Sequence, residues 1–104
     1  MLNMKSELLH SIKRANQSIE NIEWIRVIFL DDNYNDTSLI NKLEPTLEDL
    51  DVLDIGYDDG YGSTYIETSS SYVVFKDGSW LERYEYDGSE CWEYKSTPKW
   101  EEHL

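Results

Sequence analysis

The chain has 104 residues, with 22 Asp and Glu against 9 Lys and Arg, so its formal net charge is −13 and its isoelectric point is near 4.3. This length suits one domain, residues 1–104, with one modest core, because domains usually contain about 100–200 residues. Such a charge repels phosphate backbones and anionic membranes, which excludes nucleic acid and membrane as expected direct partners.

Other features narrow the class of protein further. No apolar run approaches the roughly 18 residues that span a bilayer, and Met1–Met4 is not followed by the basic and apolar pattern of a secretory signal. We therefore expect a cytoplasmic protein. Cys91 is the only cysteine, which excludes an internal disulfide and a zinc site with two cysteines.

The segment from Lys5 to Asn21 has the periodicity of one amphipathic helix. Its apolar residues recur at spacings of three and four: Leu8, Leu9, Ile12, Ala15 and Ile19. We expect Ser6 to be the N-cap and Asn21 the stop. The helix also carries a third of the basic residues, namely Lys5, Lys13 and Arg14. It is the part of the chain that is not acidic.

The next segment, Glu23–Leu30, is rich in β-branched and aromatic residues. It is apolar on both faces apart from Arg26, which predicts a central strand. A cluster of Asp and Asn follows from Asp31 to Asp36 and predicts a turn.

The segment from Thr37 to Leu53 leaves helix and strand open. Leu39, Ile40 and Leu43 suggest a short helix that is broken at Pro45, because the residue before a proline avoids the helical region. Thr46 to Leu53 fits either a second helical turn or the lead-in to a strand.

An acidic stretch follows, since Leu43 to Phe75 contains eight carboxylates and no Lys, Arg or His. Within it, Asp51–Tyr57 and Thr64–Ser70 resemble two strands. They flank the loop GYDDGYG, whose three glycines permit positive φ.

The C-terminal part contains Asp-Gly-Ser twice, at Asp77 and at Asp87. Asp-Gly between strand-like runs is the strongest short hairpin signal, so we expect a two-residue type I′ turn at each position. The two turns join three predicted strands: Tyr72–Lys76, Ser79–Tyr86 and Ser89–Thr97. The chain is therefore predicted to be an α+β fold, with the N-terminal helix packed on an antiparallel sheet of about four to five strands that ends in a three-stranded β-meander.

Two fixed turns also predict which residues face one another across the meander. In the first hairpin we expect the pairs Phe75–Trp80, Val74–Leu81, Val73–Glu82 and Tyr72–Arg83. In the second we expect Tyr84–Cys91, Arg83–Trp92, Glu82–Glu93 and Leu81–Tyr94. One face would then carry Val74, Leu81 and Tyr94 beneath the helix, with Arg83 stacked between Tyr72 and Trp92. The other face would carry Phe75, Trp80, Tyr84 and Cys91, with Glu82 directly opposite Glu93.

No catalytic, cofactor or metal site is predicted. Asp31, Asn33 and Asn35 match the start of a calcium-binding loop, but its sixth position is Asp36 and its twelfth is Lys42, where Gly and Glu are required. Neither His10 nor His103 has a predicted nucleophile beside it. Glu82 and Glu93 could act as a carboxylate pair in acid–base catalysis, yet three strands predict no pocket for them. We therefore expect a protein that is not an enzyme.

Acidic and aromatic residues that occur together predict a protein-binding surface, because Tyr and Trp carry interface energy and acidic rims attract basic partners. The expected partner-binding residues are Asp54, Tyr57, Asp58, Asp59, Tyr61, Tyr65, Glu82 and Glu93. The expected partner is a basic, nucleic-acid-handling protein whose groove the carboxylates would occupy in place of phosphates. We expect the chain itself to be a monomer or a weak homodimer.

The block DGSWLERYEYDGSECWEY, from Asp77 to Tyr94, resembles the endings of short proteins of bacterial viruses. The likeness extends over roughly Tyr72 to Trp100, which is under a third of the chain. In size, charge and composition the whole chain resembles small acidic phage-encoded anti-defence proteins, which include CRISPR inhibitors and DNA mimics that block restriction systems. The resemblance implies an inhibitor in the cytoplasm of a bacterial host. The resemblance assigns no role to any residue of this chain, because the proteins of that group share a function and have no common sequence motif. Two alternatives remain: an immunity protein that neutralises a co-encoded toxin nuclease, and a viral assembly or structural protein.

Overall fold

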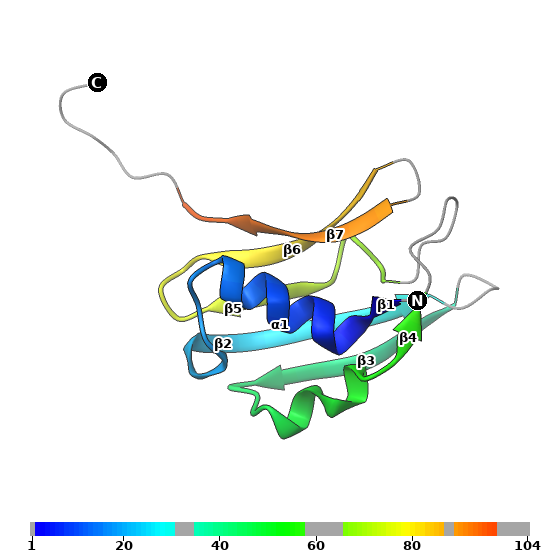
Figure 1. Ribbon diagram of the computed structural model, residues 1–104, viewed down its shortest axis with the longest axis horizontal. Coiled ribbons are helices and arrows are strands. Elements are labelled where there is room, and N and C mark those ends of the chain that lie inside the picture. Colours follow the sequence, from blue (N-terminus) through cyan, green and yellow to red (C-terminus); the bar gives the residue numbers. More distant parts are fainter. Residues whose placement is uncertain (1, 31–34, 58–65, 87–88, 98–104) are drawn as a thin grey trace.

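The computed structural model describes residues 2–30, 35–57, 66–86 and 89–97 (Figure 1). Within these ranges the elements follow in the order β1 (Leu2–Asn3), α1 (Met4–Arg14), the 3₁₀ helix η1 (Ile19–Asn21), β2 (Ile22–Leu30), β3 (Asp36–Leu43), the 3₁₀ helix η2 (Glu48–Leu53), β4 (Gly56–Tyr57), β5 (Tyr72–Phe75), β6 (Trp80–Tyr86) and β7 (Ser89–Lys95).

Five of the strands form one antiparallel sheet in the order β3-β2-β5-β6-β7. The two short strands β1 and β4 pair separately at the start of the helix. Figure 1 shows α1 lying across one face of the sheet, with η2 below it. The predicted α+β fold, with an N-terminal helix on an antiparallel sheet that ends in a β-meander, is confirmed.

The helix ends well before Asn21, which corrects the predicted boundary. Asn16 has a φ of 57°, a left-handed conformation that asparagine tolerates and that stops a helix. Its N–H donates to the carbonyl of Lys13 at 3.0 Å. The N–H of Gln17 reaches further back, to the carbonyl of Ile12 at 3.1 Å. These two bonds form a Schellman motif, so the last carbonyls of α1 already have donors.

The N-cap is also different from the predicted one. Asn3 occupies the cap position in an extended conformation, and its side-chain oxygen accepts the N–H of Ser6 at 3.0 Å. Asparagine and serine are both strong N-caps. The short β1–β4 ladder holds Asn3 extended, because Asn3 pairs with Gly56 there.

The first hairpin of the meander is shifted by one residue from the predicted register. The observed pairs are Tyr72–Glu82, Val73–Leu81 and Val74–Trp80. A shift of one residue turns every side chain of β5 to the other face of the sheet. Val73 and Phe75 therefore lie beneath the helix, both 0% exposed, while Tyr72 and Val74 lie on the far face. The predicted places of Val74, Tyr72 and Phe75 were wrong.

The loop of this hairpin explains the shift. The N–H of Phe75 donates to the carbonyl of Ser79 at 2.8 Å, so Lys76, Asp77 and Gly78 form a three-residue loop. Gly78 has a φ of 90°. A type I′ turn would also require positive φ at Asp77, which the backbone does not have there. The Asp77 carboxylate instead accepts the N–H of Ser79 at 2.9 Å and so holds the loop.

The second hairpin has the predicted register. All four expected pairs are present, from Leu81–Tyr94 to Tyr84–Cys91. Arg83 lies over the Trp92 ring, with its guanidinium carbon 5.3 Å from the ring centroid. The predicted contact of Arg83 with Trp92 is therefore confirmed, whereas Tyr72 lies on the other face and packs against Trp24 instead.

The segment that the sequence left open contains a strand and a 3₁₀ helix. Asp36–Leu43 is β3, which pairs with β2, so the suggested short helix at Leu39–Leu43 was wrong. Pairing with the exposed edge of β2 satisfies its backbone groups and outweighs the weak helical spacing. Thr46 lies just before η2 (Glu48–Leu53), and its hydroxyl and the Asp49 carboxylate each accept the backbone N–H of the other residue.

The predicted strands on either side of the acidic loop are mostly absent from the described residues. Asp51–Leu53 belongs to η2, and only Gly56–Tyr57 is extended, as β4. In the second segment, Ile66 forms a single bridge to Phe29, and residues 68–70 form a turn. The predicted turn at residues 31–36 lies largely outside the described ranges.

The core lies between α1, η2 and the sheet. Its buried apolar residues are Met4, Leu8, Ile12, Ile22, Ile25, Val27, Ile40, Leu50, Leu53, Ile66, Val73, Phe75, Leu81 and Trp92. A charged group is buried among them. The guanidinium of Arg83 contacts Glu7 at 2.6 Å and Glu90 at 3.1 Å, and the side chains of Arg83 and Glu90 are both 0% exposed. This network joins α1 to β6 and β7.

Candidate protein-binding face

The face of the sheet opposite α1 is covered by no described helix or strand. Strand pairing arranges its side chains in two rows that each cross all five strands. The first row is Leu43, Trp24, Val74, Trp80 and Lys95, and the second is Asn41, Arg26, Tyr72, Glu82 and Glu93. We call these ten side chains the open face. Tyr84 and Cys91, both exposed, continue it beyond the second row.

Aromatic residues form the centre of the open face. Trp24 and Tyr72 meet edge to face, with ring centroids 6.3 Å apart and planes inclined at 68°. They line a shallow hollow of about 250 Å³ together with Arg26, Val74 and Trp80. A second hollow of about 240 Å³ adjoins it over β3, beside Leu43, which is 72% exposed. Exposed aromatic and apolar side chains that lie together in this way make the open face a candidate interaction site.

Arg26 is held in place within this surface. Its Nε–H donates to the carbonyl of Ser70 at 2.6 Å. Its guanidinium carbon lies 5.4 Å from the centroid of the Trp24 ring, a cation–π arrangement. Because both contacts orient the side chain before any partner arrives, Arg26 and Trp24 present a preformed surface, which reduces the entropy cost of binding.

Glu82 and Glu93 lie directly opposite one another at the β6–β7 end of the open face, as predicted. Each of the two carboxylates has a neighbour that stabilises its negative charge. The indole N–H of Trp80 donates to Glu82 at 3.0 Å, and Lys95 pairs with Glu93 at 3.1 Å. The bond to Glu93 raises the pKa of Lys95 above its ordinary value. The carboxylate pair is thus fixed in position beside the aromatic hollow.

The other predicted partner-binding residues are only partly described. Asp58, Asp59, Tyr61 and Tyr65 lie outside the described residues. Tyr57 pairs with Leu2 through its backbone in the β1–β4 ladder, and its side chain is outside the description. Asp54 is exposed and accepts a hydrogen bond from the Asn3 side chain at 2.7 Å, at the start of α1. The structure therefore does not bring Asp54 together with Glu82 and Glu93.

Carboxylates near the β3 edge are largely paired within the molecule. Lys5 pairs with Asp51, Lys42 with Asp49 at 2.8 Å, and Lys76 with Glu44 at 3.2 Å. The hydrogen bond from Lys42, helped by the backbone N–H of Thr46, lowers the pKa of Asp49. These pairs reduce the local negative charge of the stretch that has the most acidic sequence.

Sequence reasoning missed Trp24, Arg26 and Tyr72 as members of a site. Trp24 and Arg26 occupy alternate positions in β2, so they share one face of the strand. That alternation is a usable signal, but the apolar residues on both faces of Glu23–Leu30 predict a strand that is buried on both sides. The predicted register of the first hairpin, which differs by one residue from the observed one, puts Tyr72 beneath the helix.

Within the described ranges, no group of three or more His, Cys, Asp or Glu residues is arranged to hold a metal ion. None of the described helices has the length and apolar character required to cross a membrane. No family model, curated protein or solved structure matches this chain. Any functional interpretation therefore depends on the chain's own residues.

Proposed function

We propose that the protein is a non-enzymatic inhibitor that binds a basic, nucleic-acid-handling protein through its open face and blocks the nucleic-acid site of that partner. The observation that carries this proposal is the combination of Trp24, Tyr72 and Trp80 around a hollow that no described element covers. Trp, Tyr and Arg dominate the energetics of protein interfaces.

Charge supports the choice of a basic partner. Glu82 and Glu93 are fixed at one end of the open face, and the chain carries a net charge of −13. Complementary potentials steer a basic partner toward this surface and favour correct orientation. A bound anionic protein would exclude phosphates from the same groove. This use agrees with the resemblance to phage-encoded anti-defence proteins.

Affinity capture from bacterial lysate, with and without added duplex DNA as competitor, tests the proposal. We expect basic nucleic-acid-binding proteins to be captured and the duplex to compete. The variant Glu82→Gln/Glu93→Gln should no longer capture these basic proteins. Glu23→Gln/Glu48→Gln removes the same charge from exposed residues outside the open face and should retain it.

Equal capture by the two double variants would show that only bulk charge matters and would refute the open face as the site. Capture of neutral or acidic proteins alone would refute the basic partner. Capture of a toxin nuclease encoded beside this chain would assign the same face to an immunity protein.

A further inference from the structure

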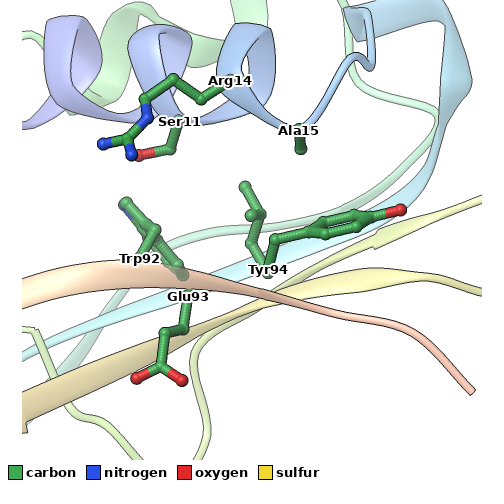
Figure 2. A pocket seen from close by; sticks show the side chains of 7 residues that line it. Ser11, Arg14, Ala15, Trp92, Glu93 and Tyr94 are labelled. Carbon is green, nitrogen blue, oxygen red and sulfur yellow. The ribbon is translucent and has the colours of Figure 1, made fainter.

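A groove of about 280 Å³ lies between the last turn of α1 and strand β7, on the side of the sheet opposite the open face (Figure 2). The residues that line it include Ser11, Arg14 and Ala15 on the helix side and Leu81, Trp92 and Tyr94 on the sheet. Glu93 is also one of the lining residues, but Figure 2 shows its side chain pointing away from the groove. The groove is therefore a separate surface with its own chemistry.

Three hydrogen-bond donors of the groove have no partner in the described part of the chain. They are the indole N–H of Trp92, the guanidinium of Arg14 and the hydroxyl of Ser11. Trp92 is only 8% exposed. Because no described buried side-chain nitrogen or oxygen lacks a partner, its N–H is not fully buried, and Trp92 is one of the residues that line the groove. Figure 2 shows Arg14 and Ser11 facing Trp92 from the helix.

The electrostatic surroundings of these donors favour an anion. Lys13 and Arg14 occupy the last turn of α1. The Arg83 guanidinium lies over the Trp92 ring, but its charge is already paired with Glu7 and Glu90. A helix C-terminus normally repels anions through its free carbonyls. Here the carbonyls of Ser11, Ile12 and Lys13 already accept backbone N–H groups, which weakens that repulsion. A carboxylate would therefore meet unpaired donors and the positive charge of Arg14.

Strand β7 offers a second means of attachment beside the groove. It is the last strand of the sheet, so its outer edge pairs with no described strand. In an antiparallel ladder, alternate residues point their N–H and C=O groups away from the partner strand. The pair Tyr86–Ser89 closes the hairpin, which leaves Glu90, Trp92 and Tyr94 with outward backbone groups. An extended peptide can add to such an edge.

We propose that the groove between α1 and β7 binds a carboxylate side chain of an extended acidic peptide, which pairs with the outer edge of β7. The peptide backbone bonds to β7 at Trp92, and one inward side chain reaches Arg14, Ser11 and the indole N–H of Trp92. Charge complementarity at the groove favours this occupant, because Arg14 takes part in none of the ion pairs of the described residues. This inference is independent of the function proposed for the open face.

Titration of ¹⁵N-labelled protein with the capped peptide acetyl-Thr-Val-Glu-Val-Thr-amide tests it by NMR. The indole resonance of Trp92, assigned with Trp92→Phe, should shift saturably together with the backbone amides of residues 90–94. The peptide with Gln in place of Glu should bind at least about tenfold more weakly, since a hydrogen bond to a charged group contributes about 1.5–3 kcal/mol. Arg14→Gln should cause a similar loss.

Lys13→Gln is the matched control, because it removes one exposed positive charge from the same helix turn without lining the groove. It should change the affinity by no more than about twofold, as expected for a screened surface charge. Equal binding of the Glu and Gln peptides, or an equal effect of the two protein variants, would overturn the carboxylate site. Equal binding of free glutarate and the Glu peptide would overturn the peptide as its occupant.

Discussion

The buried network of Arg83, Glu7 and Glu90 makes a strong prediction about stability. In Arg83→Met the aliphatic part of the side chain is kept, but the carboxylate of Glu90, which is 0% exposed, loses the nearest cation. Removing one partner of a buried ion pair costs about 3–5 kcal/mol, because the remaining charge stays buried. This is a large part of the roughly 5–15 kcal/mol that stabilises a typical domain. Arg83→Met should therefore leave the protein close to unfolding.

The double variant Arg83→Met/Glu90→Gln separates this mechanism from a simple loss of packing. With Glu90 neutral, no deeply buried charge remains, and Glu7 is 18% exposed and can reach water. We expect the double variant to be about 2 kcal/mol more stable than Arg83→Met alone, although it carries one more substitution. Urea unfolding at pH 7, followed by far-ultraviolet circular dichroism, measures both differences.

Glu90→Gln alone should cost little, because the amide oxygen can still accept from Arg83 and from the N–H of Ile66. If Arg83→Met costs under about 1 kcal/mol, or if the effects of the two single variants add in the double variant, the network does not stabilise the fold through its charges.

Three further predictions concern single residues of the meander. Hydrogen bonds from Ser79 hold the pKa of Asp77 below its ordinary 3.8, so Asp77 stabilises the fold above that pH and the contribution is lost as the pH falls through the lower folded pKa. The unfolding free energies of the wild type and Asp77→Ala should therefore converge in acid; a constant difference would contradict this. Gly78→Ala should lower stability by roughly 1–2 kcal/mol in thermal unfolding, since its φ is 90° while the added Cβ would meet no atom within 4 Å; an unchanged melting temperature would show that the loop relaxes. Partial desolvation by its neighbours raises the pKa of the Cys91 thiol, so iodoacetamide should alkylate it more slowly in the folded protein than in urea at the same pH; equal rates would argue against this.

The two hairpins show what the sequence could and could not predict. Both contain Asp-Gly-Ser, and the same turn rule was applied to each. It gave the correct register at Asp87 and an incorrect one at Asp77. The rule fails at Asp77 because of the strand that precedes that turn. Val73 and Phe75 must both lie beneath the helix with Leu81, and only the three-residue loop places them there.

Local propensity was similarly insufficient between Asp36 and Leu53. Leu39, Ile40 and Leu43 have a helical spacing, yet β2 requires a partner on its outer edge and β3 supplies it. The reciprocal hydrogen bonds between Thr46 and Asp49 were visible in the sequence as a capping pattern, Thr-x-x-Asp, which resembles a capping box. Using that pattern would have favoured a helical segment after Pro45.

The candidate site was predictable only in part because net charge does not locate a binding surface. Of the described cations, Lys5, Lys42, Lys76, Arg83 and Lys95 all pair with carboxylates of this chain. The first three of these pairs neutralise carboxylates between Leu43 and Phe75. The surface formed by that stretch is therefore less negative than its sequence predicts. The long-range field of −13 charges can still accelerate encounter with a basic protein.

The local chemistry of the side chains therefore distinguishes one surface from another. On the open face, Glu82 and Glu93 adjoin an aromatic hollow, whereas in the groove Arg14 and the indole N–H of Trp92 have no described partner. The two surfaces lie on opposite sides of one sheet, so the proposed basic partner and the proposed acidic strand would not compete for the same residues. The net charge of the sequence does not distinguish these two candidate surfaces, whereas the fold places their side chains on opposite faces of the sheet.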